Sequence, residues 1–384
     1  MRIASVIDRF HPARGGAERV ALELAKALVR RGHEVATFTI LHDRALPLAE
    51  EVEGMKIRRV EERLPPPPVR TLFYERIVSK RLCEVVAAER WDAILIHPLA
   101  AGWEVSKLAP PKLAFFYAPF HQELGLERRG PLAWWQGLLR RSYQRRILER
   151  VEMIAILSDC SGEWLRAFAP ACVWKARKIP PGVDAKRFTP GDRTASRARF
   201  GLGGQFVVAT ARRLVPRMGL EEIVRAAGLL KASGLELQVR IAGEGPLRLC
   251  LEGELERAGF DRSCLLGPVT DEALVDLYRA ADLIVMPSLA LEAFGLVALE
   301  ALACGTPALV ARCTGAAEVV GTICPDLVLE LAEPAEIARK VRLFAEKYHG
   351  DLGLRAECRR VVETSFTWDA MAERVQEAIG RPSS

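Results

Sequence analysis

Two glutamates eight residues apart, Glu292 and Glu300, are the residues whose types and spacing most directly suggest chemistry. Between them, Gly295 precedes an apolar segment that is expected to begin a helix. The free N–H groups of a helix's first turn, with the positive end of the helix dipole behind them, bind phosphate, and glycine lets a ligand approach the backbone closely. Helical rise alone separates the two carboxylates by up to about 12 Å. That spacing suits hydroxyl groups at the two ends of a nucleotide sugar.

Glutamates with this spacing also occur on ordinary solvated helix surfaces. Here they lie between a predicted strand, Asp282–Met286, and the turn Gly305–Pro307. This setting favours a ligand site over a solvated surface.

The elements that must position these residues alternate between short β-rich runs and longer amphipathic segments, a pattern typical of parallel α/β layers. The first half predicts strands at Arg2–Ile7, Glu34–Ile40, Ala93–His97, Lys112–Tyr117 and Glu152–Leu157. The second half predicts strands at Phe206–Ala211, Glu236–Ala242, Asp282–Met286 and Pro307–Ala311. Helices are expected over Ala17–Arg30, ending at Gly32, and over Trp368–Ile379. The stretch Ile179–Gly204, rich in proline and glycine, predicts an interdomain linker.

Composition sets the class of protein. The 384 residues are 50% hydrophobic and 27% charged, which is typical of a globular chain with two domains of under about 200 residues each. No apolar run reaches the roughly 18–20 residues that span a bilayer, and the N-terminus predicts a strand rather than a signal peptide. The nine cysteines lack the CxxC spacing of a zinc site or a disulfide framework. We therefore expect a cytoplasmic protein.

Several motifs, in order along residues 1–378, resemble the family 4 glycosyltransferases. They are the E-x7-E stretch Glu292–Glu300, Gly15–Val20, Ile179–Asp184 with Phe188, Gly243–Pro246, Leu277–Tyr278, Ala281–Asp282 and Phe366–Trp368. The resemblance implies the GT-B fold, in which two Rossmann-like doubly wound domains, 1–185 and 186–365, face each other across a cleft. Residues 366–384 would then form a helix that packs back on the first domain. It also implies retaining transfer of a hexosyl group from a UDP- or GDP-sugar, in polysaccharide, glycolipid or glycoconjugate biosynthesis, to a glycan, lipid-linked or small-molecule acceptor.

The same resemblance implies residue roles. Glu300 would bond the ribose and Glu292 would contact the donor sugar. The diphosphate would meet Arg213 and the backbone of Phe294, Gly295, Leu296 and Val297. Gly15 and Gly16 would close over it from the first domain, and Gly243 would also line the donor site. Guanidinium suits phosphate because it is permanently charged and binds in two-point fashion; the alternative for Arg213 is a surface salt bridge.

The chain departs from the family pattern at Met218, where relatives usually have a second diphosphate cation, a lysine. Arg212 and Arg217 flank this loop. Adjacent side chains of an extended strand point to opposite faces, so we expect Arg212 to face away from Arg213 and Arg217 to be the better substitute.

A second departure concerns the cleft histidine of the first domain. Relatives often have a histidine where this sequence has Tyr117. His121 follows four residues later and is the candidate catalytic group from the loop, with Tyr117 and Glu123 as competing polar contacts.

The implied reaction breaks the bond between the anomeric carbon and phosphate, so negative charge grows on the departing diphosphate. A helix N-terminus and Arg213 would stabilise that charge. We expect no metal cofactor, because the sequence has no Asp-x-Asp pair or histidine cluster suited to Mg²⁺ or Mn²⁺.

The first half of the chain, which would hold the acceptor, is basic, with 32 Lys/Arg against 22 Asp/Glu in residues 1–190. Within residues 131–150, Trp134, Trp135, Leu138 and Leu139 precede five arginines. Aromatic and aliphatic residues beside arginines suit an anionic membrane surface, which would make the protein peripheral at the inner face of the membrane. The alternative is a helix packed on the sheet with solvated arginines. A nucleic-acid partner is not expected, because no aromatic platform or known module accompanies the charge.

Two other functions remain open. Met218 and the displaced histidine would also fit a catalytically impaired homologue that binds nucleotide sugars. A sugar-nucleotide epimerase of the same fold would not need the Gly15–Gly16 loop, and a phosphorylase would need a pyridoxal-binding lysine that the sequence does not identify.

Overall fold

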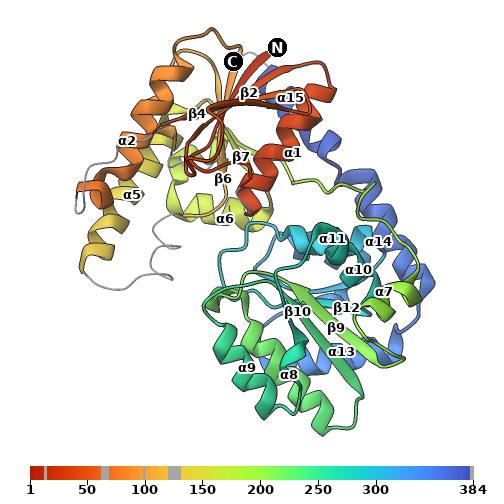
Figure 1. Ribbon diagram of the computed structural model, residues 1–384. Helices are drawn as coiled ribbons and strands as arrows, with labels where there is room; N and C mark the ends of the chain where they lie inside the picture. The colour runs from red at the N-terminus through yellow and green to blue at the C-terminus, as the bar shows by residue number, and fades with distance from the viewer. Residues whose placement is uncertain (13–14, 62–68, 98–100, 120–130, 381–384) are drawn as a thin grey trace. The chain divides into compact units, whose positions relative to one another are not determined.

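The computed structural model describes residues 1–12, 15–61, 69–97, 101–119 and 131–380, without the side chains of 69–72 and 131–134 (Figure 1). Contacts divide the chain into two units. Unit 1 comprises Met1–Pro181 with Trp368–Ser384, and unit 2 comprises Gly182–Thr367. Each unit is a parallel sheet with helices around it. All nine cysteines are free thiols.

Unit 1 has an eight-stranded sheet with the order β3-β4-β2-β1-β5-β6-β7-β8, in which every neighbouring pair is parallel except β3 and β4. The strands are β1 (Arg2–Val6), β2 (Glu34–Ile40), β3 (Ala49–Val52), β4 (Met55–Val60), β5 (Ala93–Ile96), β6 (Lys112–Phe116), β7 (Met153–Ile156) and β8 (Ala176–Lys178). The helices are α1 (Gly16–Arg30), α2 (Val69–Val86), α3 (Gly102–Val105), α5 (Pro131–Arg150), α6 (Asp159–Phe168) and α15 (Trp368–Gly380).

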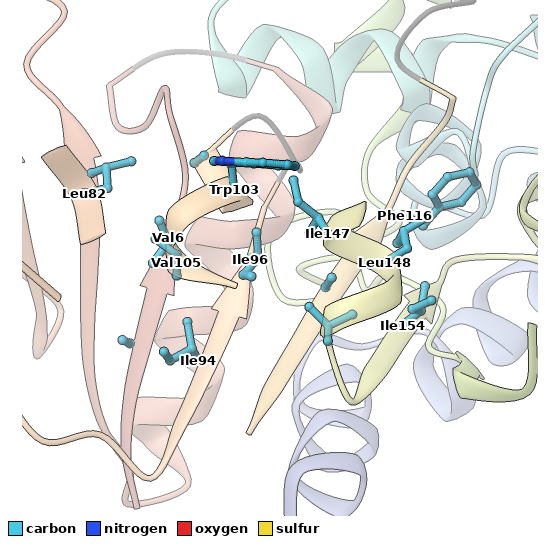
Figure 2. Packing of buried hydrophobic residues seen from close by; sticks show 14 of the residues in the cluster. Val6, Leu82, Ile94, Ile96, Trp103, Val105, Phe116, Ile147, Leu148 and Ile154 are labelled. Carbon is cyan, nitrogen blue, oxygen red and sulfur yellow. The ribbon is translucent and has the colours of Figure 1, made fainter. Parts of the chain in front are cut away.

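The core of unit 1 forms because its central strands are apolar along their whole length. Strands β5 and β6 are buried at every position, as expected for parallel strands covered on both faces. Figure 2 shows Ile94 and Ile96 of β5 beside Trp103 and Val105 of α3, with Ile147 of α5 packed next to them. This packing fixes the strand ends from which polar residues emerge.

Unit 2 has a six-stranded, all-parallel sheet with the order β11-β10-β9-β12-β13-β14. The strands are β9 (Phe206–Ala211), β10 (Leu237–Ala242), β11 (Leu265–Gly267), β12 (Leu283–Met286), β13 (Ala308–Ala311) and β14 (Val328–Leu329). The helices are α7 (Arg193–Arg199), α8 (Leu220–Ala232), α9 (Arg248–Arg257), α10 (Asp271–Ala280), α11 (Leu296–Ala303), α12 (Ala316–Ile323), α13 (Pro334–Lys347) and α14 (Leu352–Ser365).

Each of the nine predicted strands is present, with ends within one residue of the prediction. Helix α1 ends at Arg30, and Gly32 adopts the left-handed conformation (φ +84°) expected just past a helix end. The linker predicted over Ile179–Gly204 was wrong in part, because it contains α7, whose first turn is capped by the Asp192 carboxylate accepting from the Ala195 amide at 3.0 Å. The strands β3, β4, β8, β11 and β14 were not predicted.

The unit boundaries lie at Pro181/Gly182 and Thr367/Trp368, compared with the expected limits of 185 and 365. Helix α15 belongs to unit 1, where it packs against α1. An ion pair of 2.8 Å joins Arg30 to Asp369 at that contact.

Candidate functional site

The order of the strands in unit 2 identifies the edge of the sheet where a ligand would bind. Chain order runs outward in one direction from β9 through β10 to β11, and in the other from β12 through β13 to β14. In open parallel sheets, ligands bind beside the carboxyl ends of the two strands where this order reverses. Strand β9 ends at Ala211 and β12 ends at Met286. Arg212 and the loop that carries Glu292 follow directly.

Gly295 is required at the start of α11. Its φ of +98° is left-handed, and a Cβ there would lie 2.7 Å from the Met286 Cε. The loop before it is fixed by the Ala316 amide, which donates to the Phe294 carbonyl at 2.7 Å. The Ala298 amide of the first turn of α11 donates to the Gly295 carbonyl at 3.0 Å. The amides of Leu296 and Val297 before it have no carbonyl one turn back within the helix, which makes them the candidates to bind an anion.

Glu300 lies inside α11 and is only 4% exposed. The Tyr278 hydroxyl of α10 donates to its Oε2 at 2.7 Å. Tyr278 is itself fully buried, and its carbonyl accepts from the Thr306 hydroxyl at 2.7 Å. Glu300 is therefore held rigidly. Its predicted contact with a ribose stays a prediction.

Glu292 lies in the loop before α11 rather than on the helix, so helical rise does not set its distance from Glu300. Its Oε2 accepts from the Arg212 Nη2 at 2.6 Å. The Arg212 side chain is 3% exposed and that of Glu292 is 20% exposed. Burial lowers the pKa of the Arg212 guanidinium, and the Glu292 carboxylate acts in the opposite direction.

Gly243 supports this pair from the neighbouring strand. It follows β10 with φ +128°, and a Cβ there would lie 1.9 Å from the Arg212 carbonyl oxygen. Only glycine therefore lets the backbone that follows β10 lie this close to the backbone that follows β9. A donor contact of Gly243 itself stays a prediction.

Arg213 and Arg217 occupy different surroundings. Arg213 is exposed and makes no ion pair with any residue that the structure describes. Arg217 donates from Nη1 to the Leu291 carbonyl at 3.1 Å, so it holds the loop that carries Glu292. Met218 is 7% exposed and supplies no charge. As expected, Arg212 and Arg213 lie in opposite surroundings, Arg212 buried and bonded to Glu292 and Arg213 exposed. That Arg217 replaces the missing lysine stays a prediction.

In unit 1 the strand order reverses between β1 and β5. Gly15 and Gly16 begin α1 there, after β1, and the direction of a Gly16 Cβ is open space. Glu18 lies in the first turn of α1. Burial raises the pKa of Asp8, just beyond the end of β1, to about 6, with the Glu18 charge adding to the effect.

His97 and Tyr117 form a hydrogen-bonded pair just beyond the ends of β5 and β6. The His97 Nδ1 and the Tyr117 hydroxyl are 2.9 Å apart, and the His97 ring stacks on Phe115 at 3.9 Å. Burial lowers the pKa of His97 to about 3 and raises that of Tyr117 well above its ordinary value. Sequence reasoning missed His97, although its place at the end of a buried strand next to that of Tyr117 could have indicated it. His121 and Glu123 lie outside the described residues.

Helix α5 packs on the core near its C-terminal end and exposes apolar side chains nearer its start; the predicted contact with a membrane surface stays a prediction. Ile147 and Leu148 pack into the core, whereas Trp135 and Leu138 are 58% and 40% exposed. Of its arginines, Arg150 lies 4.7 Å from the centre of the Trp103 ring. The side chain of Trp134 lies outside the description.

Within the described residues, no cluster of three or more His, Cys, Asp or Glu is placed to hold a metal ion. The described helices also include none that is long and apolar enough to cross a membrane.

Comparisons with known proteins give consistent matches. The family model described as Glycosyltransferase Family 4 matches residues 14–187, and the model described as Glycosyl transferases group 1 matches residues 192–365. A D-inositol 3-phosphate glycosyltransferase from Actinosynnema mirum is 30% identical over 340 residues, 78% of this chain and 76% of the relative. One from Nocardia farcinica is 36% identical over 215 residues, 52% of this chain and 46% of the relative, so that match spans about half of each protein.

Among solved structures, Anabaena Alr3699/HepE in complex with UDP-glucose matches with a TM-score of 0.78 and 18% identity, covering 99% of each chain. At that identity the likeness concerns the fold alone.

Proposed function

The chain belongs to the family 4 glycosyltransferases, and from this membership we propose that it transfers a hexosyl group from a UDP- or GDP-sugar with retention of anomeric configuration. The observation that carries the proposal is the group at the reversal point of the second sheet: the free amide end of α11, the buried Tyr278–Glu300 pair and the Arg212–Glu292 pair. The N-terminal end of α11 offers N–H donors to phosphate, and the carboxylates of Glu292 and Glu300 offer acceptors to hydroxyl groups.

The chemistry follows from where charge develops. When the anomeric carbon–phosphate bond breaks, negative charge grows on the departing diphosphate, and fixed N–H donors stabilise that charge without reorganisation. The amides of Leu296 and Val297 and the exposed guanidinium of Arg213 are the groups we assign to it. In this scheme no metal is needed.

The donor and acceptor are chosen for testing from the relatives. The Anabaena protein is bound to UDP-glucose, and the relatives are named for D-inositol 3-phosphate. We therefore take UDP-glucose as the first donor to test, with a sugar phosphate, a glycan and a lipid-linked sugar as acceptors in polysaccharide, glycolipid or glycoconjugate synthesis.

The test is a screen of the purified chain against UDP-, GDP- and ADP-sugars, in which release of nucleoside diphosphate is measured with chelator present. Release with at least one sugar, and an NMR spectrum that gives the transferred sugar the donor's anomeric configuration, would support the proposal. An inverted product, or turnover only after Mg²⁺ or Mn²⁺ is added, would contradict retention or metal independence.

The second candidate is an impaired homologue that binds nucleotide sugars without turnover, favoured by the buried, uncharged Met218. Thermal stabilisation by UDP or GDP without turnover would support it, as would activity that appears only in Met218→Lys. An epimerase would instead convert the donor sugar into its epimer with no acceptor present.

We also propose that the protein is cytoplasmic and binds anionic membranes through the exposed Trp135 and Leu138 of α5. Pelleting with vesicles of phosphatidylglycerol, but not with phosphatidylcholine, would support this. The double variant Trp135→Ala/Leu138→Ala should lose the binding. Trp174→Ala, which alters a tryptophan that is 74% exposed elsewhere in unit 1, should retain it. Equal pelleting of all three proteins would contradict the assignment.

A further inference from the structure

The arginine–glutamate pair beside α11 has hydrogen-bonding capacity that the protein itself does not use. The Nη2 of Arg212 donates to Glu292, whereas its Nη1 is buried and has no hydrogen-bond partner among the described residues. On the other side of the pair, only Oε2 of Glu292 accepts from a described residue. One donor and one acceptor therefore remain unused, side by side.

Such an arrangement is costly unless a ligand completes it. Arg212 is 8% exposed, and a buried donor on a charged group that lacks a partner is strongly destabilising. The Arg212 amide nevertheless donates to the Ala242 carbonyl at 2.9 Å, which fixes the backbone of Arg212 beside β10. The unused donor thus lies next to the carboxylate that the proposed function gives to the donor sugar.

The charge of the pair indicates what kind of group it receives. Because the Arg212 guanidinium is matched by Glu292, the pair offers little net charge to a diphosphate. A donor and an acceptor held a few ångströms apart instead fit the neutral hydroxyls of a sugar ring. Arg213, exposed and without a described ion pair, is the better cation for phosphate.

We propose that Arg212 is a positioning and sugar-recognition residue: it orients Glu292 and donates from Nη1 to a hydroxyl of the donor sugar. This inference rests on the proposed function and adds to it the recognition of the sugar. It also predicts that the missing lysine at position 218 is not replaced by Arg212, since the two would serve different parts of the donor.

The test compares binding of UDP-glucose with binding of UDP by calorimetry, using the full chain. In Arg212→Met, the Kd for UDP-glucose should rise at least about tenfold, whereas the Kd for UDP should change by less than about twofold. The double variant Arg212→Met/Glu292→Gln should bind UDP-glucose no more weakly than the weaker single variant, because the two residues act as one unit.

The control is Arg240→Met. Arg240 has the same exposure of 8%, lies on the neighbouring β10 and bonds only protein groups, among them the Val239 and Phe200 carbonyls. It should lose stability but keep the difference between the two ligands. If Arg212→Met does not fold, Arg212→Lys serves instead, since one ammonium cannot orient Glu292 and also donate in the plane of the guanidinium.

Each outcome decides the matter. Equal weakening of UDP and UDP-glucose would overturn the proposal by making Arg212 a phosphate ligand. An unchanged Kd for both ligands would also overturn it, because Arg212 would then not contribute to the donor site. In both cases the wild type still binds UDP-glucose, so the proposed function stands. If the wild type binds neither ligand, the same comparison is made with the nucleotide sugar that the donor screen identifies and its nucleoside diphosphate. A wild type that binds no nucleotide sugar of that screen overturns the proposed function and this inference with it.

Discussion

At the scale of single residues, the hydroxyl of Tyr278 should contribute both to stability and to nucleotide binding. In Tyr278→Phe, the buried Glu300 carboxylate loses its 2.7 Å donor. We expect a loss of about 1–3 kcal/mol in the free energy of unfolding and weaker binding of nucleoside diphosphates. Tyr348→Phe is the matched control, because its hydroxyl donates to Asp326 at 2.8 Å in a more exposed setting. Unchanged nucleotide binding in Tyr278→Phe would argue against a ribose site at Glu300.

Asp8 should make stability depend on pH. Its folded-state pKa of about 6 lies above the ordinary value of 3.8, so the folded protein holds the proton more tightly than the unfolded chain. Stability from this group is therefore present at low pH and is lost as pH rises from about 4 to 6, by at most about 3 kcal/mol.

Replacing Asp8 with Asn removes that ionisation. The stability advantage of Asp8→Asn over the wild type should be small at about pH 4 and below, grow as pH rises to about 6, and remain at about 1–3 kcal/mol at pH 8. Denaturant unfolding at several pH values measures it. An advantage that shrinks as pH rises would show that Asp8 is held ionised in the folded protein.

At the scale of elements, the start of α11 depends on one glycine. Gly295→Ala would force a side chain into a left-handed conformation and against Met286, so we expect a loss of about 1–3 kcal/mol and of nucleotide binding. Gly321→Ala is the control, because it lies within α12 and its Cβ would meet Val328 at an ordinary 3.6 Å. That change should be neutral or stabilising. Retained nucleotide binding in Gly295→Ala would speak against a phosphate site at α11.

At the scale of the whole molecule, the second crossing between the units brings the chain's end back to unit 1. Helix α15 packs against α1 and β6, and its buried side chains are Trp368, Met371, Ala372, Val375 and Ile379. Truncation after Thr367 should therefore destabilise unit 1 and leave unit 2 intact. Hydrogen exchange should show faster exchange in α1 and unchanged exchange in β9 and β12. Faster exchange throughout unit 2 would contradict this division.

The sequence by itself determined the layered α/β class, the nine strands and the motif with its two glutamates, because apolar periodicity and glycine positions act locally. The same local signals missed β3 and β4, where polar residues alternate, and β8, β11 and β14, which have two or three residues each. They also missed the helix α7 inside a proline- and glycine-rich stretch. Only the tertiary structure decided that Arg212 turns inward to Glu292 and that His97 meets Tyr117. The physical reason is that strand order and the close backbone approach at Gly243 set which side chains meet. Local sequence patterns do not show which distant residues are paired in this way.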